Sequence, residues 1–145
     1  MVSYTQQYQY DALGNILKLI HQASGNNWTR DYFYQSGKNY LKGHTSGATS
    51  YTYDTHGNMT SMPHLSSMQW DIYDNLKEVN LGGGGTAYYI YNANGDRVRK
   101  IIENGVHRTE RIYIGQTEIY REYVSGTLQK ERESLHVSDD TGRIA

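Results

Sequence analysis

The chain has 145 residues, of which 14 are basic and 15 acidic, so its net charge is −1, and it contains no cysteine. This balance argues against a nucleic-acid binder or an anionic-membrane binder, and the lack of a long apolar run predicts no membrane insertion. The N-terminal segment has neither a basic nor an apolar region of the kind a signal peptide needs. Tyrosine is the unusual residue, with 15 copies against one phenylalanine.

The first predicted element is a hairpin near the N-terminus. Tyr8 and Tyr10 alternate with polar residues, Asp11 and Gly14 follow them, and an apolar run begins at Ile16. Alternating tyrosines place both rings on one face of a strand. The Asp-x-x-Gly segment indicates a turn, because Asp accepts hydrogen bonds from nearby amides and glycine adopts positive φ easily. We therefore expect a second strand to return from Ile16.

Further copies of this frame follow along the chain. The clear copies are Tyr51, Tyr53, Asp54 and Gly57, and then Tyr89, Tyr91, Asn92 and Gly95. The degenerate copies are Tyr32, Tyr34 and Gly37, and then Trp70, Tyr73 and Asp74. The marker tyrosines 10, 34, 53, 73, 91 and 113 predict units of about twenty residues, which suits two short strands and two turns. The units run over residues 4–24, 28–47, 48–66, 67–84, 85–106 and 107–145.

These repeats predict an all-β fold of consecutive antiparallel β-hairpins. The weak helical candidate at 127–134 is short, and we assign it to a strand or loop. Isolated hairpins are marginal in water, so successive units should stack their tyrosine faces into one coiled sheet. The edges of such a sheet are open and invite self-association. Residues 1–145 are expected to form a single repeat fragment of a longer array.

The Tyr-x-Tyr-Asp-x-x-Gly-Asn frame resembles the YD repeat of the Rhs (rearrangement hot spot) proteins, which also occurs in teneurins. Several segments are most similar to the Rhs-repeat part of insecticidal toxin-complex C components and SpvB-associated proteins. These segments are 21–30, 70–71, 81–89 and 133–140. The resemblance covers nearly the whole chain.

The resemblance implies a β-sheet shell that encapsulates a toxic C-terminal cargo domain in a secreted bacterial toxin-type protein. Members of the family release the cargo by aspartyl self-cleavage at a proline-containing core motif. The only proline of this chain is Pro63, and that motif is absent. We therefore expect a non-catalytic, structural segment, whose partners are neighbouring repeats of the same protein and the enclosed toxin domain.

Other chemical signals have simpler structural explanations, so we expect no catalytic residue, no metal site and no cofactor. Asp139 and Asp140 could form an acid–base pair, but adjacent residues on a strand point to opposite faces. The glycine run 82–85 lacks the Lys-Ser/Thr ending of a phosphate-binding loop and predicts a hairpin connection. The histidines lack metal-ligand spacing; they stand at 21, 44, 56, 64, 107 and 136.

The tyrosines leave two interpretations open. Paired rings at strand spacing are most simply cross-strand packing partners. Exposed Tyr and Trp rings also bind sugars and protein surfaces, which makes an extracellular carbohydrate- or protein-binding module the alternative function. Tyr40, Tyr88 and Tyr123 lie outside the repeat positions, so they are the better candidates for such a surface.

Overall fold

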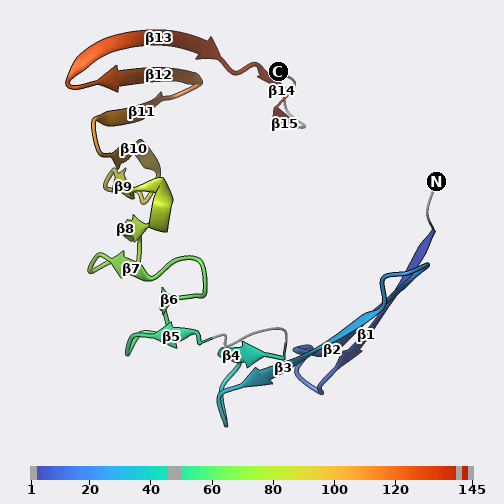
Figure 1. Ribbon diagram of the computed structural model, residues 1–145. Helices are drawn as coiled ribbons and strands as arrows, with labels where there is room; N and C mark the ends of the chain where they lie inside the picture. The colour runs from blue at the N-terminus through green and yellow to red at the C-terminus, as the bar shows by residue number, and fades with distance from the viewer. Residues whose placement is uncertain (1–2, 46–49, 140–141, 144–145) are drawn as a thin grey trace. The chain divides into compact units, whose positions relative to one another are not determined.

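The computed structural model describes residues 3–45, 50–139 and 142–143, and it divides into two compact units, residues 1–63 and 64–145. The described residues form antiparallel strands and one short 3₁₀ turn, which confirms the predicted all-β fold of consecutive hairpins (Figure 1). The segment 127–134, the weak helical candidate, lies in a strand. No helix in the described part of the chain is long and apolar enough to span a membrane.

The first unit contains a four-stranded meander and a short hairpin. The meander has the order β1-β2-β3-β4, so each strand pairs with its neighbours in sequence. Its strands are β1 (Tyr4–Tyr10), β2 (Ile16–Ala23), β3 (Trp28–Tyr34) and β4 (Leu41–His44). The hairpin is made of β5 (Thr52–Tyr53) and β6 (Met59–Ser61).

The second unit is dominated by a seven-stranded antiparallel meander of order β13-β12-β11-β10-β9-β8-β7. Its elements are β7 (Ser67–Trp70), β8 (Leu76–Asn80), η1 (Gly82–Gly84), β9 (Thr86–Tyr91), β10 (Arg97–Asn104), β11 (His107–Ile114), β12 (Thr117–Val124) and β13 (Thr127–Leu135). A separate pair follows, β14 (Ser138–Asp139) and β15 (Gly142–Arg143).

Short turns set the register of the longest strands. Val124 pairs with Thr127, so Ser125 and Gly126 alone join β12 to β13. Both turn residues have positive φ, 48° and 80°. This is the turn geometry whose twist matches that of the flanking strands, and it favours a glycine at the second position.

Among residues 3–45, 50–139 and 142–143, the ladder hydrogen bonds divide the strands into four sheets that follow one another along the chain. The β5–β6 hairpin forms a sheet of its own. Pro63 follows this hairpin and has no backbone N–H, so it cannot donate to a strand ladder. Pro63 is also the last residue of the first unit.

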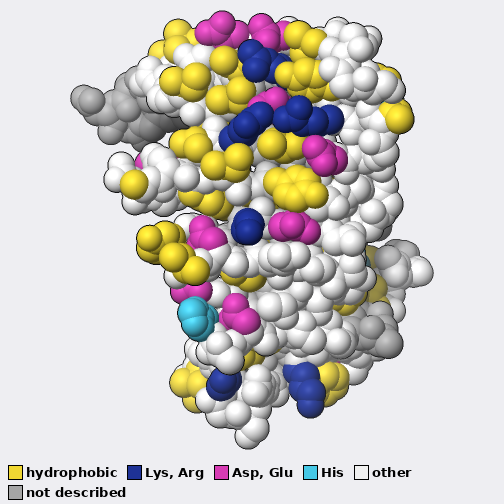
Figure 2. Space-filling view, turned by 90° about the vertical axis from the view of Figure 1, so that its left-hand side faces the viewer, with side chains coloured by type: hydrophobic (Ala, Val, Ile, Leu, Met, Phe, Trp, Pro, Cys, Tyr) yellow, Lys and Arg dark blue, Asp and Glu magenta, His cyan; other side chains and the backbone are white. Residues whose placement is uncertain are grey.

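Very few side chains form a dry core. Among the described residues, the buried hydrophobic side chains are Met68, Val79 and Ala87, which lie opposite one another on β7, β8 and β9. Elsewhere, hydrophobic, acidic and basic side chains lie next to one another at the surface (Figure 2). Contacts between repeats must therefore replace much of the stabilisation that a globular core provides.

Candidate functional site: contacts that join the repeats

A network of hydrogen bonds closes four of the repeat turns, as the turn after Tyr53 illustrates. The Asp54 carboxylate accepts hydrogen bonds from the backbone N–H groups of His56 and Asn58 through Oδ1, both at 2.9 Å. Its Oδ2 accepts a third from the Asn58 side-chain amide at 3.1 Å. The Asp54 N–H donates to the Asn58 carbonyl at 2.9 Å. One carboxylate thus satisfies three donors in a five-residue turn.

The same network recurs in three other turns. Asp11 with Asn15 and Asp71 with Asn75 repeat every contact with the same residue types. In the fourth turn the two types are exchanged: Asn92 Oδ1 accepts the backbone N–H groups, and Asn92 Nδ2 donates to Asp96 Oδ2 at 3.0 Å. The exchange keeps one amide donor and one carboxylate acceptor, so the geometry persists.

The fourth position of each turn requires positive φ. Gly14, Gly57 and Gly95 occupy it with φ of 87°, 96° and 84°. In the remaining turn the residue is Asp74, with φ of 60°. Asp tolerates this left-handed region better than most non-glycine residues.

The repeat register at Trp70 differs from the one suggested by tyrosine spacing. Trp70 precedes Asp71 as Tyr53 precedes Asp54, and a register shift of the strand ladder occurs at both Trp70 and Tyr53. Tyr73 lies inside the turn instead, and its side chain is 78% exposed. Trp70 therefore occupies the marker position, because the Asp-x-x-Asp-Asn turn chemistry follows it directly.

The turn contacts shift the acidity of the aspartates. The hydrogen bond from the Asn15 side chain lowers the pKa of Asp11 below its ordinary value. At Asp54, burial alone would raise the pKa, but the hydrogen bonds from Asn58 outweigh it and the pKa is lowered. The Asn75 backbone N–H is the main cause of the lowered pKa of Asp71. These three turns are therefore most stable with the carboxylates of Asp11, Asp54 and Asp71 ionised.

Marker tyrosines bind the preceding repeat through their hydroxyl groups. Tyr53 Oη donates to the Leu41 carbonyl at 2.9 Å, and Leu41 is the first residue of β4. The equivalent bonds run from Tyr34 to the Ile16 carbonyl and from Tyr91 to the Leu76 carbonyl, both at 3.0 Å; Ile16 and Leu76 begin β2 and β8. We call this contact the tyrosine latch; its three hydroxyls are those of Tyr34, Tyr53 and Tyr91.

Burial accompanies each latch. It raises the pKa of Tyr34, Tyr53 and Tyr91 above the ordinary value of 10.0, because the ionised phenolate would lose hydration. The latch needs the neutral phenol as donor, so the local environment and the hydrogen bond favour the same protonation state. A phenylalanine could fill the same space but could not donate to the carbonyl.

A tyrosine ring of the second repeat also stacks on a tyrosine ring of the third. Tyr40 lies on Tyr53 with centroids 4.7 Å apart and planes 22° apart, and the Lys38 ammonium is 4.9 Å from the Tyr40 centroid. Gly57 lies beneath the Tyr40 ring: a Cβ at this position would be 2.9 Å from Tyr40 Cζ and closer to the hydroxyl oxygen. Tyr40 is thus a packing residue, and its half-buried ring also lines a surface groove with Tyr51 and Tyr53.

The remaining predicted tyrosines have mixed environments. Tyr8 and Tyr10 stack on each other at 6.3 Å, but they lie on the edge strand β1 and are 43% and 56% exposed. Tyr89 is half-buried beneath Arg97, 5.6 Å from its centroid. Tyr51 is half-buried and lines a groove of about 750 Å³ with Tyr34, Tyr40 and Tyr53. Tyr88 and Tyr123 are half-buried as well.

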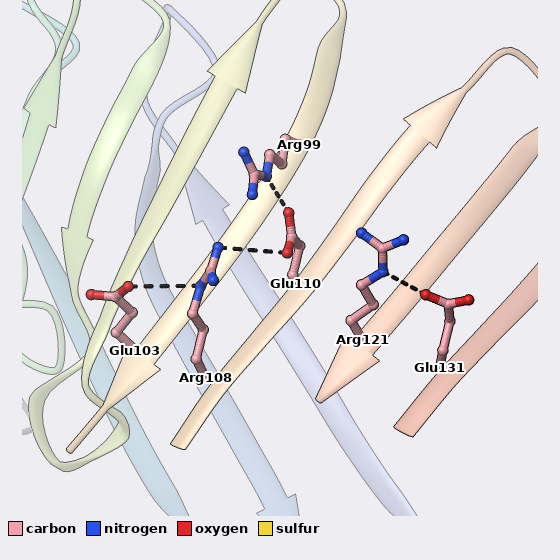
Figure 3. Close-up of polar contacts among 6 residues, drawn as sticks. All are labelled: Arg99, Glu103, Arg108, Glu110, Arg121 and Glu131. Carbon is pink, nitrogen blue, oxygen red and sulfur yellow. Dashed lines mark hydrogen bonds and ion pairs between the residues drawn. The ribbon is translucent and has the colours of Figure 1, made fainter. Parts of the chain in front are cut away.

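A chain of ion pairs crosses the second unit, and sequence analysis did not find it. Glu110 on β11 is only 2% exposed and lies between Arg99 and Arg108 (Figure 3). Arg108 Nη2 is 3.5 Å from Glu110 Oε2, and Arg121 Nε is 2.6 Å from Glu131 Oε2. The ion pairs on β10 and β11 link Glu103 to Arg108, Arg108 to Glu110 and Glu110 to Arg99, so the sign alternates along the chain of contacts. Strand periodicity alone places Arg108 and Glu110 on one face of β11, whereas the pairs Arg99–Glu110 and Arg121–Glu131 depend on cross-strand register.

The residues considered for catalysis do not form a site within the described part of the chain. Asp139 lies in β14, whereas Asp140 lies outside the described residues. Gly82–Gly85 connects β8 to β9, and a Cβ at Gly85 would be 2.8 Å from Asn104 Cβ, so this glycine allows a close approach to the end of β10. Among the described residues, no three His, Asp or Glu side chains cluster in metal-binding geometry.

No protein-family model and no curated protein matches the sequence. Solved structures do match. A crystal structure of TcdB2-TccC3 without its hypervariable C-terminal region has a TM-score of 0.77 and 20% identity over 94% of this chain. The Photorhabdus luminescens Tc holotoxin pore, with a mutation in TccC3, has a TM-score of 0.77 and 22% identity over 94% of this chain. The matched region is 7% of each of those chains. The chain therefore has the fold of one section of these far longer molecules.

Proposed function

We propose that the chain is a non-catalytic section of the β-sheet wall of an Rhs/YD-repeat shell. The observation that carries this proposal is the likeness to TcdB2-TccC3, which extends over 94% of the chain but only 7% of the longer molecule. The tyrosine latch supports it, because each latch joins a repeat to the one before. A repeat array of this kind gains stability from neighbour contacts and has no need of a central core.

The enclosed partner in this proposal is a toxic domain within the same secreted protein. One of the similar structures is that of TcdB2-TccC3 without its hypervariable C-terminal region, so that molecule has a variable segment at its C-terminal end. The near-neutral, mixed-sign surface of the present chain suits a wall that must not bind its contents strongly, because charges of one sign would attract any oppositely charged domain.

The reading frame that encodes residues 1–145, and the protein it produces, test this proposal. Further repeats on both sides and a hollow particle in electron micrographs are expected, with one segment resistant to protease until the particle is opened. Tyr53→Ala should open the particle and expose that segment, whereas Tyr73→Ala, at the exposed turn position, should not. A frame confined to these 145 residues, or a product without a cavity, would refute the wall function.

The groove in the first unit favours one other function, carbohydrate binding. Four tyrosines line it with two cations, Lys38 and Lys42, and one carboxylate, Asp54. Aromatic rings beside an excess of cations suit an acidic sugar. We would measure binding of a heparin oligosaccharide and of a neutral oligosaccharide by calorimetry. Saturable binding that Lys38→Gln and Tyr51→Ala abolish would support this function, and absence of binding at millimolar concentration would refute it.

A further inference from the structure

The outer side of β13 is an open edge of the seven-stranded sheet. β13 pairs with β12 on one side, and among the described residues no strand pairs with its other side. Eight of its nine side chains are exposed, and Ser134 is half-buried. The edge of a strand presents unpaired backbone N–H and C=O groups, which can bind another strand.

The charges of β13 are sorted by face. Cross-strand pairing places Glu131 opposite Arg121, and therefore on the same face as Glu110. Glu133 shares that face, since side chains two residues apart on a strand lie on the same side. Lys130 and Arg132 lie on the opposite face. We call the two sides the Glu110 face and the Lys130 face.

On both faces, the charges of β12 are opposite in sign to the charges of β13 that they contact. Arg121 on the Glu110 face contacts Glu131 at 2.6 Å (Figure 3), and Glu122 on the Lys130 face lies 4.0 Å from Lys130. Two charges of β13 are left over. Within the described residues, neither Arg132 nor Glu133 has an ion-pair partner: Arg132 is 5.6 Å from the Tyr120 centroid, and Glu133 lies opposite Ile119.

We propose that the outer edge of β13 binds an antiparallel strand of the β12 type, with a cation followed by an anion, as in Arg121-Glu122. The cation would lie opposite Glu133 on the Glu110 face, and the anion opposite Arg132 on the Lys130 face. Opposite charges in direct cross-strand pairs stabilise a sheet, and like charges destabilise it.

A second copy of β13 fits this edge poorly. Two copies related by a twofold axis perpendicular to the sheet pair antiparallel with the same faces together. Glu131 and Glu133 of one copy would then meet glutamates of the other, and the cations would meet cations. Edge charges that serve only to keep other strands from pairing with β13 need no particular order of signs along the strand. The sorted order favours recognition of a complementary strand.

The test uses the 145-residue chain and a peptide with the sequence of residues 117–124. The control peptide exchanges the residues equivalent to Tyr120 and Arg121, which keeps composition and net charge but puts all three charges on one face of the strand. Because each face of residues 130–133 carries charges of a single sign, no register gives the control more than one opposite-charge pair, whereas the β12 peptide can form two. We expect the β12 peptide to bind about threefold more tightly than the control. It should also slow hydrogen exchange at the β13 amides that point away from β12.

Chain variants locate the binding edge. Arg132→Gln with Glu133→Gln should reduce the threefold preference to near unity. Lys77→Gln with Glu78→Gln, the matched change on the interior strand β8, should leave it unchanged. The proposal is overturned if both peptides bind equally, if neither protects β13 at millimolar concentration, or if sedimentation shows a dimer of the chain that buries β13.

Discussion

Gly57 offers the sharpest test of how the repeats pack. A side chain at this position destabilises the fold in two ways, through the left-handed backbone and through the Tyr40 ring, and the backbone cost can be measured separately. Gly57→Ala places a Cβ at φ of 96° and against the Tyr40 ring. Left-handed backbone costs an alanine about 1–2 kcal/mol, and the lower entropy of the unfolded chain offsets about 0.4–1 kcal/mol. Gly14→Ala has φ of 87° and no atom within 4 Å of the added Cβ, so it reports this backbone cost alone, about 1 kcal/mol.

Gly57→Ala must also displace Tyr40. The ring would lose its stacking on Tyr53, about 0.5–1.5 kcal/mol, and its contact with Lys38, about 0.5–1 kcal/mol. We therefore expect a total loss of about 2–3.5 kcal/mol for Gly57→Ala, or a Tm about 6–11 °C lower, against about 3 °C for Gly14→Ala.

Urea and thermal unfolding of both variants provide the measurement, with Tyr40→Ala as a second background. Once the Tyr40 ring is removed, only the backbone cost remains, so Gly57→Ala should cost no more than Gly14→Ala. Both turns lie in the first unit, so the two losses refer to the unfolding of the same unit. Two results would contradict the packing argument: equal losses for the two glycines in the wild-type background, or an undiminished Gly57→Ala loss in the Tyr40→Ala background.

Three further changes probe the latch, the turn and the buried charge. Tyr53→Phe should cost about 1–2 kcal/mol by leaving the Leu41 carbonyl unpaired, whereas Tyr73→Phe should leave the urea midpoint unchanged. The lowered pKa of Asp54 means that its carboxylate stabilises the fold above about pH 4 and that this contribution disappears as the pH falls through the lowered pKa; Asp54→Asn should flatten the acid limb of stability against pH. Glu110→Ala should cost about 1–3 kcal/mol in urea unfolding, since Arg99 and Arg108 lose their shared carboxylate but stay partly exposed and Arg108 keeps Glu103, and a loss under about 0.5 kcal/mol would show that the shared carboxylate is dispensable.

The turns could be predicted from sequence because all their contacts lie within five residues. Asp54, Gly57 and their neighbours suffice to specify three hydrogen bonds and a positive φ, whatever the rest of the chain does. The exchange of Asn92 and Asp96 was also readable, since it keeps a donor opposite an acceptor. Trp70 was harder, because tyrosine spacing pointed to Tyr73; the turn residues that follow Trp70 were the better guide.

Contacts across strands could not be predicted in the same way. Glu110 looks like an ordinary strand glutamate in the sequence, and its burial depends on which residues β10 and β12 place beside it. A shift of one residue in either pairing would move every side chain to the other face. The partner of Glu110 is therefore a property of register, which two-residue turns such as Ser125-Gly126 help to fix.

The distribution of contacts explains why tyrosine, and not phenylalanine, dominates this chain. A sheet whose buried hydrophobic side chains are as few as Met68, Val79 and Ala87 gains little from rings that only avoid water. The phenol adds a hydrogen bond to the first carbonyl of the preceding return strand, a group that the register shift near the marker residue leaves available. Each latch thus adds both apolar contact and a directional bond between repeats. Because the bond depends on that one carbonyl, it specifies register as well as stability, which an apolar ring could not do.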